Sequence, residues 1–279
     1  MAKILIVGAG DVGGRLALLL VADGHEVVAL RRSAVALSGV RVLQADVTRP
    51  DSLQLPDGLD VVVTALSPGE SGVEAYRRVY VEGTRALQQA LAGQQLAHQF
   101  WVSSTSVYGE DAGEHIDETT PAQPASATAR ALLDAEALVT SSPWPATIVR
   151  FGGLYGPGRH RLLRWVEEGR PVQAEPPSWS NRMHVEDAAG LLRHLVTQAL
   201  AGQAPAALCL GVDNEPAALH EVLAWLAGEM RLTPPPGEAR PGASQGKRIA
   251  NRGLCASGYV LRYPDYRAGY RQVLAARKI

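Results

Sequence analysis

A glycine-rich run near the N-terminus has the spacing of a phosphate-binding turn. Gly8, Gly10 and Gly13 form the pattern GxGxxG, which directly follows an apolar run and directly precedes a helical one. There the first glycine permits a tight turn, the second lets the backbone approach a pyrophosphate, and the third allows close helix–strand packing. A turn that serves packing alone is the alternative. We expect a dinucleotide to bind at Gly8, Gly10, Asp11, Val12 and Gly13.

The end of the next apolar run selects between NAD and NADP. An acid at this place binds the ribose 2′-hydroxyl, whereas an arginine accommodates a 2′-phosphate. The chain has Arg31, Arg32 and Ser33 there and no acid. Charge-assisted hydrogen bonds from these groups would hold a phosphate, so we expect NADP to be preferred over NAD. The alternative is that the two arginines are simply solvated. Three further cofactor contacts are expected at Asp46, Val47 and Ala65. For Asp46, the alternative is a plain turn aspartate.

Strand–helix alternation in the first half supplies the elements that position these residues. Continuous apolar runs such as Val61–Val63 are typical of strands buried on both faces. The alternation therefore predicts an α/β fold, a Rossmann-type doubly wound parallel sheet with a smaller C-terminal substrate domain. The expected strands are Lys3–Val7, Glu26–Leu30, Arg41–Leu43, Val61–Ala65, Gln99–Ser103 and Ala146–Arg150. The expected helices are Val12–Ala22, Tyr76–Ala92 and Ala125–Thr140.

The regular alternation of strands and helices ends after Arg150. We expect residues 1–150 to form the NAD(P)-binding domain, with parts of 180–212 returning to it, and residues 151–279 to form a smaller substrate-binding region. A stretch rich in proline and glycine, Thr233–Gly246, is expected to be a loop. The other expected elements are helices near Arg159–Glu168, from His184 to about Leu200 and at Leu219–Met230, and a strand at Ala207–Leu210.

Composition excludes some classes of protein. The net charge of −1 provides no general attraction to nucleic acid or to an anionic membrane. Cys209 and Cys255 are too few for a disulfide scaffold and fit no metal motif. The N-terminus lacks the pattern of a signal peptide, and no apolar run is long enough to cross a bilayer. We expect a cytoplasmic protein that binds a small molecule and neither metal, nucleic acid nor membrane.

Four landmark motifs are distributed along the chain: Gly8–Gly13, Ser103–Gly109, Arg150–Gly158 and Arg182–Ala188. Together they resemble a known family, the extended short-chain dehydrogenase/reductases. Its members include NAD-dependent epimerases and dehydratases of nucleotide sugars. The resemblance covers most of the chain and implies a nucleotide-sugar type of substrate and a homodimer formed through helices near 76–92 and 125–140. The GxGxxG spacing departs from the family's usual GxxGxxG, which marks an atypical branch.

The catalytic motif of that family is incomplete in this chain. Members generally use a Ser or Thr, a Tyr and a Lys, the last two spaced as YxxxK. The resemblance implies that the tyrosine is the acid/base and that the lysine lowers its pKa, since a phenol of pKa about 10 needs a neighbouring cation at neutral pH. Ser104 holds the serine position. Aligned on Glu136, however, Thr128 and Leu132 stand where the tyrosine and the lysine should be.

A change of register does not restore the pair. The sequence has no lysine between Lys3 and Lys247 and no tyrosine between Tyr108 and Tyr155. Acid–base work would fall to other groups, such as His184, which titrates in a suitable range. Each of them also has a structural interpretation, as a packing residue of a loop or as a hydrogen-bonded histidine. The candidate catalytic residues are Ser104, Tyr108, Tyr155 and His184.

Arginines in the second half suit an anionic substrate. Arg159 and Arg182 lie in landmark loops, and guanidinium groups bind phosphate and carboxylate in a bidentate manner. Solvated helix faces are the alternative for these residues. The sequence thus favours an NAD(P)-dependent enzyme, epimerase/dehydratase-like or reductase-like, that acts on an anionic small molecule such as a nucleotide sugar with non-standard acid–base residues. The alternative is a catalytically silent NADP-binding redox sensor.

Overall fold

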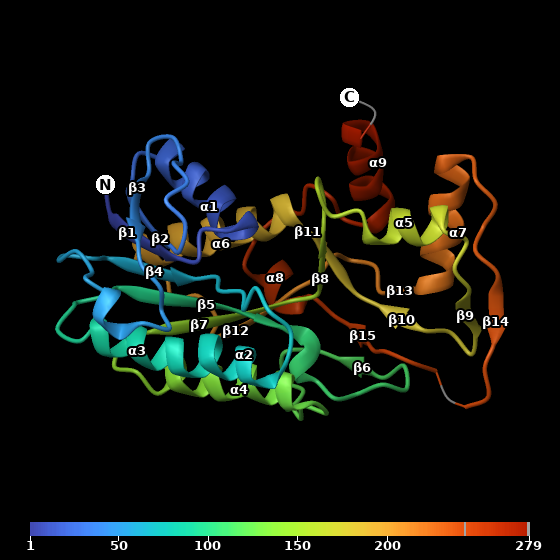
Figure 1. Cartoon of the computed structure of the whole chain (residues 1–279), viewed down its shortest axis with the longest axis horizontal. Helices are drawn as coiled ribbons and strands as arrows, with labels where there is room; N and C mark the ends of the chain where they lie inside the picture. The colour runs from blue at the N-terminus through green and yellow to red at the C-terminus, as the bar shows by residue number, and fades with distance from the viewer. Residues whose placement is uncertain (243, 278–279) are drawn as a thin grey trace. The chain divides into compact units, whose positions relative to one another are not determined.

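A computed structural model describes residues 1–242 and 244–277 of the chain (Figure 1). The residues fall into two compact units, each assembled from separate segments. Unit 1 comprises Met1–Gly109, Ala122–Arg150 and Ala188–Cys209, and unit 2 comprises Glu110–Pro121, Phe151–Asp187 and Leu210–Ile279. The segment 110–121 belongs to unit 2 although it lies within the expected first domain. Lys278 lies outside the described residues.

A seven-stranded parallel sheet forms the centre of unit 1, which confirms the predicted fold class. The strand order is β12-β7-β5-β4-β1-β2-β3, so the chain winds outward from β1 on one side and then from β4 on the other. In such sheets a ligand binds outside the carboxyl ends of the strands, where the order reverses. The strands are β1 (Lys3–Val7), β2 (Glu26–Arg31), β3 (Arg41–Gln44), β4 (Val61–Thr64), β5 (His98–Ser104), β7 (Ala146–Phe151) and β12 (Leu208–Gly211).

Helices cover both faces of this sheet, as the doubly wound fold requires. Figure 1 shows α1 and α6 on one face and α2, α3 and α4 on the other. The helix expected at Tyr76–Ala92 begins at Val73 and ends at Ala90, and its middle is a π-helical turn, η2. These helices are α1 (Asp11–Ala22), α2 (Val73–Tyr76), η2 (Arg77–Glu82), α3 (Gly83–Ala90), α4 (Ala127–Thr140) and α6 (Val185–Leu200).

The core of unit 1 is built on β1 and its neighbours. Ile4 to Val7 are fully buried, as expected of a central parallel strand covered on both faces. Leu5 and Val7 pack in one cluster with Leu87 of α3. Burying each such side chain contributes roughly 1.5–3 kcal/mol. This packing fixes the carboxyl end of β1, from which the glycine turn begins.

Unit 2 combines short strand pairs with four helices among its described residues. Three pairs are parallel and join segments far apart in sequence: β8 (Gly153–Tyr155) with β11 (Arg182–His184), β9 (Val172–Glu175) with β14 (Gly237–Ala239), and β6 (His115–Ile116) with β15 (Arg248–Ile249). The loop expected at Thr233–Gly246 therefore contains a strand, because β14 finds a partner that local sequence does not reveal. The remaining elements are β10 (Trp179–Ser180), β13 (Ala217–Ala218), α5 (Arg161–Glu167), α7 (Leu219–Met230), α8 (Arg252–Ala256) and α9 (Tyr266–Arg277).

Aromatic and aliphatic side chains from α5, α7 and α9 form the core of unit 2. Leu163, Leu223 and Leu226 are fully buried beside Tyr266 and Tyr270. None of the helices in the described part of the chain has the length and apolarity needed to span a membrane.

Candidate functional site: a cavity at the carboxyl ends of the central strands

The glycine turn has the geometry that the sequence predicts. Gly8 has φ +92°, and a Cβ there would lie 2.4 Å from the carbonyl oxygen of Ala65. A Cβ on Gly13 would lie 2.4 Å from the carbonyl oxygen of Gly8, so α1 packs directly on the turn. At Gly10, in contrast, a Cβ would meet nothing within 4 Å. The first and third glycines are therefore required by the protein's own packing, whereas the second leaves space open.

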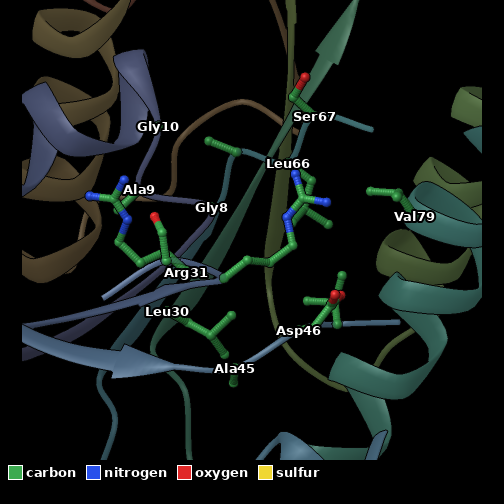
Figure 2. A pocket seen from close by; sticks show the side chains of 14 residues that line it. Gly8, Ala9, Gly10, Leu30, Arg31, Ala45, Asp46, Leu66, Ser67 and Val79 are labelled. Carbon is green, nitrogen blue, oxygen red and sulfur yellow. The ribbon is translucent and has the colours of Figure 1, made fainter. Parts of the chain in front are cut away.

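That open space is part of a cavity of about 310 Å³ within unit 1, a size in the range of ligand pockets. Figure 2 shows residues from several strand ends around it, among them Gly8, Gly10, Arg31 and Asp46. Eight of the expected cofactor residues line the cavity: Gly8, Gly10, Arg31, Arg32, Ser33, Asp46, Val47 and Ala65. Sequence reasoning missed six others, which are Ala9, Leu30, Ala45, Leu66, Ser67 and Val79.

Three expected cofactor residues lie beside the cavity rather than on its wall. Asp11, Val12 and Gly13 form the first turn of α1. The Asp11 carboxylate accepts a hydrogen bond from Arg15 Nε at 2.9 Å, one turn along the helix. Because Gly10 lines the cavity and directly precedes α1, the N-terminus of this helix, with its N–H groups and positive dipole end, lies at the edge of the cavity.

One wall of the cavity is positively charged, because Arg31 and Arg32 have no ion-pair partner among the described residues. Arg31 Nε is buried and has no hydrogen-bond partner, and its Nη1 makes only a long contact of 3.4 Å with the carbonyl oxygen of Val35. The Arg32 guanidinium lies against Gly69, where a Cβ would be 3.0 Å from Nη2. Neither arginine forms a salt bridge in the part of the chain that the structure describes. Two such guanidinium groups suit an incoming phosphate.

A slot of the same cavity is lined by Asp46 and Val47, which follow β3 in the chain. Asp46 is held by Thr48, whose backbone N–H and hydroxyl both donate to Oδ1 at 2.9 and 2.8 Å. Burial opposes ionisation of this carboxyl, but the Thr48 hydrogen bonds and the charge of Arg32 outweigh it and lower the pKa of Asp46. Val47 is packed against Gly83, where a Cβ would lie 2.7 Å from Val47 Cγ2.

The π-helical turn brings Val79 to the same slot. π turns are frequent at functional sites because the extra residue re-aims side chains. No sequence signal marks this turn, since the residues Arg77–Glu82 have an ordinary helical pattern.

The candidate catalytic residues of unit 1 have different surroundings. Ser104 ends β5, is half-buried, and its hydroxyl accepts a hydrogen bond from the Ser106 N–H at 3.1 Å. Tyr108 is 1% exposed, and its hydroxyl accepts from Arg150 Nη1 at 2.7 Å. The Arg150 guanidinium also lies 4.9 Å from the centre of the Tyr108 ring. Of the two, Ser104 is the one a substrate could reach.

A buried ion pair accounts for the environment of Tyr108. Arg150 Nη2 and Nε donate to the two carboxylate oxygens of Glu136 at 2.6 and 3.0 Å, and the Ser103 hydroxyl donates to Glu136 at 2.5 Å. Burial alone would lower the pKa of Arg150, but the hydrogen bonds and charge of Glu136 raise it. The network ties β5, α4 and β7 together. Sequence reasoning used Glu136 only as an alignment landmark and missed this role.

The positions that correspond to the family's Tyr and Lys hold no acid–base group. Thr128 lies in the first turn of α4, with its hydroxyl 3.1 Å from that of Ser126, which caps the helix. Leu132 is buried in the core.

In unit 2, Tyr155 and His184 are buried in an aromatic cluster. Tyr155 stacks on Tyr270 at 4.5 Å between ring centres, and burial raises its pKa. His184 is fully buried; its Nδ1 accepts from the Glu186 N–H at 3.3 Å, and its Nε2 lies 3.3 Å from the side-chain oxygen of Gln272. These contacts are those of packed residues.

The two arginines expected to bind substrate also differ. Arg159 is exposed on the loop before α5. Arg182 is buried, and its guanidinium lies 5.2 Å from the centre of the Tyr266 ring. Among the described residues no group of three or more His, Cys, Asp or Glu side chains is placed to hold a metal ion.

A glycine turn, a charged cavity wall and a strand-order reversal define a dinucleotide-binding protein of the Rossmann class. Residues 8–181 match the family model described as NAD(P)H-binding, and the chain belongs to this family.

Relatives place the chain among NAD(P)-dependent enzymes. It is 31% identical over 261 residues to the 3-diazoavenalumate denitrifying reductase of a Streptomyces species, which covers 84% of this chain and 83% of that protein. A solved structure assigned as an NAD-dependent epimerase/dehydratase of Methylobacillus flagellatus is 40% identical, with a TM-score of 0.87 and coverage of 100% of this chain and 99% of that one. MoeE5, solved with UDP-glucose and NAD, shares the fold at 23% identity, with a TM-score of 0.79 and 99% coverage of both chains.

These findings confirm the resemblance to the epimerase/dehydratase-like family and the expectation of an NAD(P) cofactor. They also support assignment as an NAD(P)-dependent enzyme, since the relatives include an epimerase/dehydratase and a reductase.

Proposed function

We propose that this protein is an NADP(H)-dependent reductase of a small anionic substrate. The observation that carries the proposal is the cavity wall formed by Arg31 and Arg32, two guanidinium groups without an ion pair among the described residues. They stand at the end of β2, where a 2′-phosphate is accommodated. The Ser33 hydroxyl would add a third donor.

The rest of the cavity suits the remaining parts of the cofactor. The space over Gly10 and the start of α1 would receive the pyrophosphate. Asp46, Val47 and Val79 would hold the adenine. When bound, NADPH supplies a hydride from its dihydronicotinamide ring.

The missing Tyr/Lys pair favours a reductase over an epimerase or a dehydratase. Oxidation of a sugar hydroxyl requires a base that removes its proton, and this chain has neither residue of the usual pair. Hydride delivery to a strongly electrophilic centre needs no such base, because the two electrons of the broken C–H bond go directly to the acceptor. The relative named as a denitrifying reductase of a diazo compound supports this class of substrate.

Ser104 is the chain's own contribution to the reacting end. Its hydroxyl is half-buried at the carboxyl end of β5, where it could orient a polar atom of the substrate. Tyr108 would have a positioning role, because the hydrogen bond from Arg150 holds its hydroxyl in place.

The test is turnover of NADPH by the purified protein with a panel of anionic diazo and carbonyl compounds, and of UDP-glucose with NAD⁺ as a comparison. We expect substrate-dependent loss of NADPH absorbance with one reduced product formed per NADPH, and no epimer of UDP-glucose. Ser104→Ala should lower kcat while the Kd for NADP⁺ stays unchanged. Epimerisation of the sugar nucleotide, or a preference for NADH, would overturn the proposal.

A catalytically silent NADP-binding sensor is the second candidate. It is favoured by the burial of Tyr108, Tyr155 and His184 in structural contacts. Its test is a cofactor-dependent change in binding to a partner, with no NADPH consumed by any compound of the panel. Homodimer formation through helices near 76–92 and 125–140 stays a prediction, which sedimentation of the purified protein would test.

A further inference from the structure

Unit 2 contains a buried charged group whose hydrogen-bonding capacity is not filled. Arg182 opens β11 and is 4% exposed. Its Nη2 donates to the backbone carbonyl and the hydroxyl of Ser180 at 3.3 and 2.5 Å, but its Nη1 is buried and has no partner. A buried donor on a charged group costs free energy when nothing accepts from it.

The neighbouring buried carboxyl of Asp213 also has an atom without a hydrogen-bond partner. Asp213 follows β12 and is 2% exposed. Its Oδ1 accepts from the Glu215 N–H at 3.2 Å, whereas its Oδ2 is buried without a partner. The Asp213 N–H donates to the carbonyl oxygen of Arg182 at 2.7 Å, so the backbone holds the two residues next to each other. No ion pair joins their side chains within the described residues.

Tyrosines surround these two groups. The Arg182 guanidinium lies over Tyr266, and the stacked rings of Tyr155 and Tyr270 are close enough for the charges of Arg182 and Asp213 to affect the pKa of both phenols. In the described part of the chain the Tyr270 hydroxyl has no hydrogen bond. The Tyr155 hydroxyl makes only a long one, 3.5 Å to the carbonyl oxygen of Asp265.

We propose that Arg182, Asp213 and Tyr270 form a binding site for an oxyanion of the substrate, either a carboxylate or a phosphate. Arg182 Nη1 and the Tyr270 hydroxyl donate to the anion, and Asp213 donates through a proton on Oδ2. Bidentate or convergent donors of this kind are the usual recognition of such groups. The assignment of the oxyanion to the substrate rests on the proposed function, whereas the binding site itself does not.

The protonation of Asp213 is consistent with its surroundings. Burial raises the pKa of Asp213 to about 7. The charge of Arg182 and the hydrogen bond from the Glu215 N–H oppose this rise, and the negative charges of Glu215 and Asp265 add to it. The remaining titratable groups that face it are Tyr155 and Tyr270. A bound anion adds negative charge next to Asp213 and favours its protonated form further. Above neutral pH, binding must therefore take up a proton, and affinity falls about tenfold per pH unit.

The experiment is calorimetric titration of the whole protein with sodium sulfate and with sodium acetate, in buffers of different ionisation enthalpy. We expect saturable binding, with uptake of about one proton at about pH 8 and almost none at about pH 6. Tighter binding of acetate would identify a carboxylate site, and tighter binding of sulfate a phosphate site. Absence of saturable binding of either probe would overturn the proposal.

Variants separate this site from other cationic surfaces. Asp213→Asn keeps a donor but cannot titrate, so it should bind equally at both pH values without proton uptake. Arg182→Met should lose at least tenfold in affinity, while Arg240→Met, which removes an exposed arginine of the same unit, should change nothing. If Arg182→Met fails to fold, Asp213→Asn still decides, because persistent proton uptake in that variant contradicts the proposal.

NADP⁺ titration of the same samples distinguishes the two proposals. Oxyanion binding without NADP⁺ binding would remove the proposed function and leave this site standing. NADP⁺ binding and NADPH turnover without oxyanion binding would overturn the oxyanion site and leave the proposed function standing.

Discussion

Replacing Gly10 by alanine should weaken cofactor binding at least tenfold while leaving the protein folded. Gly10 lines the cavity with φ −81° and ψ −141°, and a Cβ there would meet no atom of the protein within 4 Å. Gly14→Ala is the matched control, because its Cβ would make an ordinary 3.7 Å contact with the carbonyl oxygen of Ala9 and does not face the cavity.

The magnitudes of the two effects separate them. Gly14→Ala lies inside α1 and should stabilise the protein by about 0.5–1 kcal/mol, since glycine is the poorer helix former. Gly10→Ala should lower the free energy of unfolding by about 1–3 kcal/mol, because a ψ of −141° lies outside the regions that alanine ordinarily adopts. Its methyl group would also occupy the space that the pyrophosphate needs. Loss of one hydrogen bond to a charged group, worth about 1.5–3 kcal/mol, weakens binding roughly 10- to 150-fold.

The assay is calorimetric titration with NADP⁺, with chemical denaturation of each variant as the control for folding. Unchanged NADP⁺ affinity in a well-folded Gly10→Ala protein would refute the placement of the pyrophosphate over this residue. Equal losses in Gly10→Ala and Gly14→Ala would show that the effect comes from α1 as a whole rather than from the cavity.

Three other substitutions test separate parts of the structure. Arg31→Asp should weaken NADP⁺ binding at least tenfold and leave NAD⁺ binding nearly unchanged, measured by paired titrations; an unchanged ratio would remove the 2′-phosphate assignment. Arg150→Met should destabilise the protein by about 3–5 kcal/mol in denaturant unfolding, because it leaves Glu136 buried without its cation, and Arg150→Met with Glu136→Leu should recover part of the loss. Asp213 has a folded pKa of about 7, above the ordinary 3.8, so it binds more protons folded than unfolded and stability falls as pH rises between those values. Asp213→Asn should therefore gain stability relative to the natural protein across that window, by up to about 1.4 kcal/mol per pH unit, and a constant difference would contradict the shift.

The central fold could be predicted because its signals are local. Continuous burial of Ile4–Val7 and Val61–Val63 follows from apolar runs, and the turn between strand and helix follows from glycine spacing. The predicted sheet strands agree with the structure to within a residue or two at each end. In unit 2 the pairing of β9 with β14 could not be predicted, because both strands are short and lie far apart in sequence.

The cavity was predictable where a backbone requirement or a charge marks the sequence. Gly8, Gly10 and Arg31 belong to such positions, whereas Val79 reaches the cavity only through a π turn with no sequence signal. The role of Glu136 depends on a side-chain network that joins three elements.

The acid–base candidates illustrate a second limit. Residue type and proximity to a landmark selected Tyr108, Tyr155 and His184, but burial and hydrogen bonding decide which side chains are accessible. All three are at most 4% exposed. The absence of the Tyr/Lys pair, in contrast, was evident from the sequence alone.

A crystal structure of the protein with NADP⁺ would show directly whether the cavity holds the cofactor. We expect the pyrophosphate over Gly10 and the 2′-phosphate within about 2.7–3.2 Å of a guanidinium nitrogen of Arg31 or Arg32. An adenosine end bound outside this cavity, or a 2′-phosphate in solvent with both arginines turned away from it, would show that this cavity is not the NADP⁺ site.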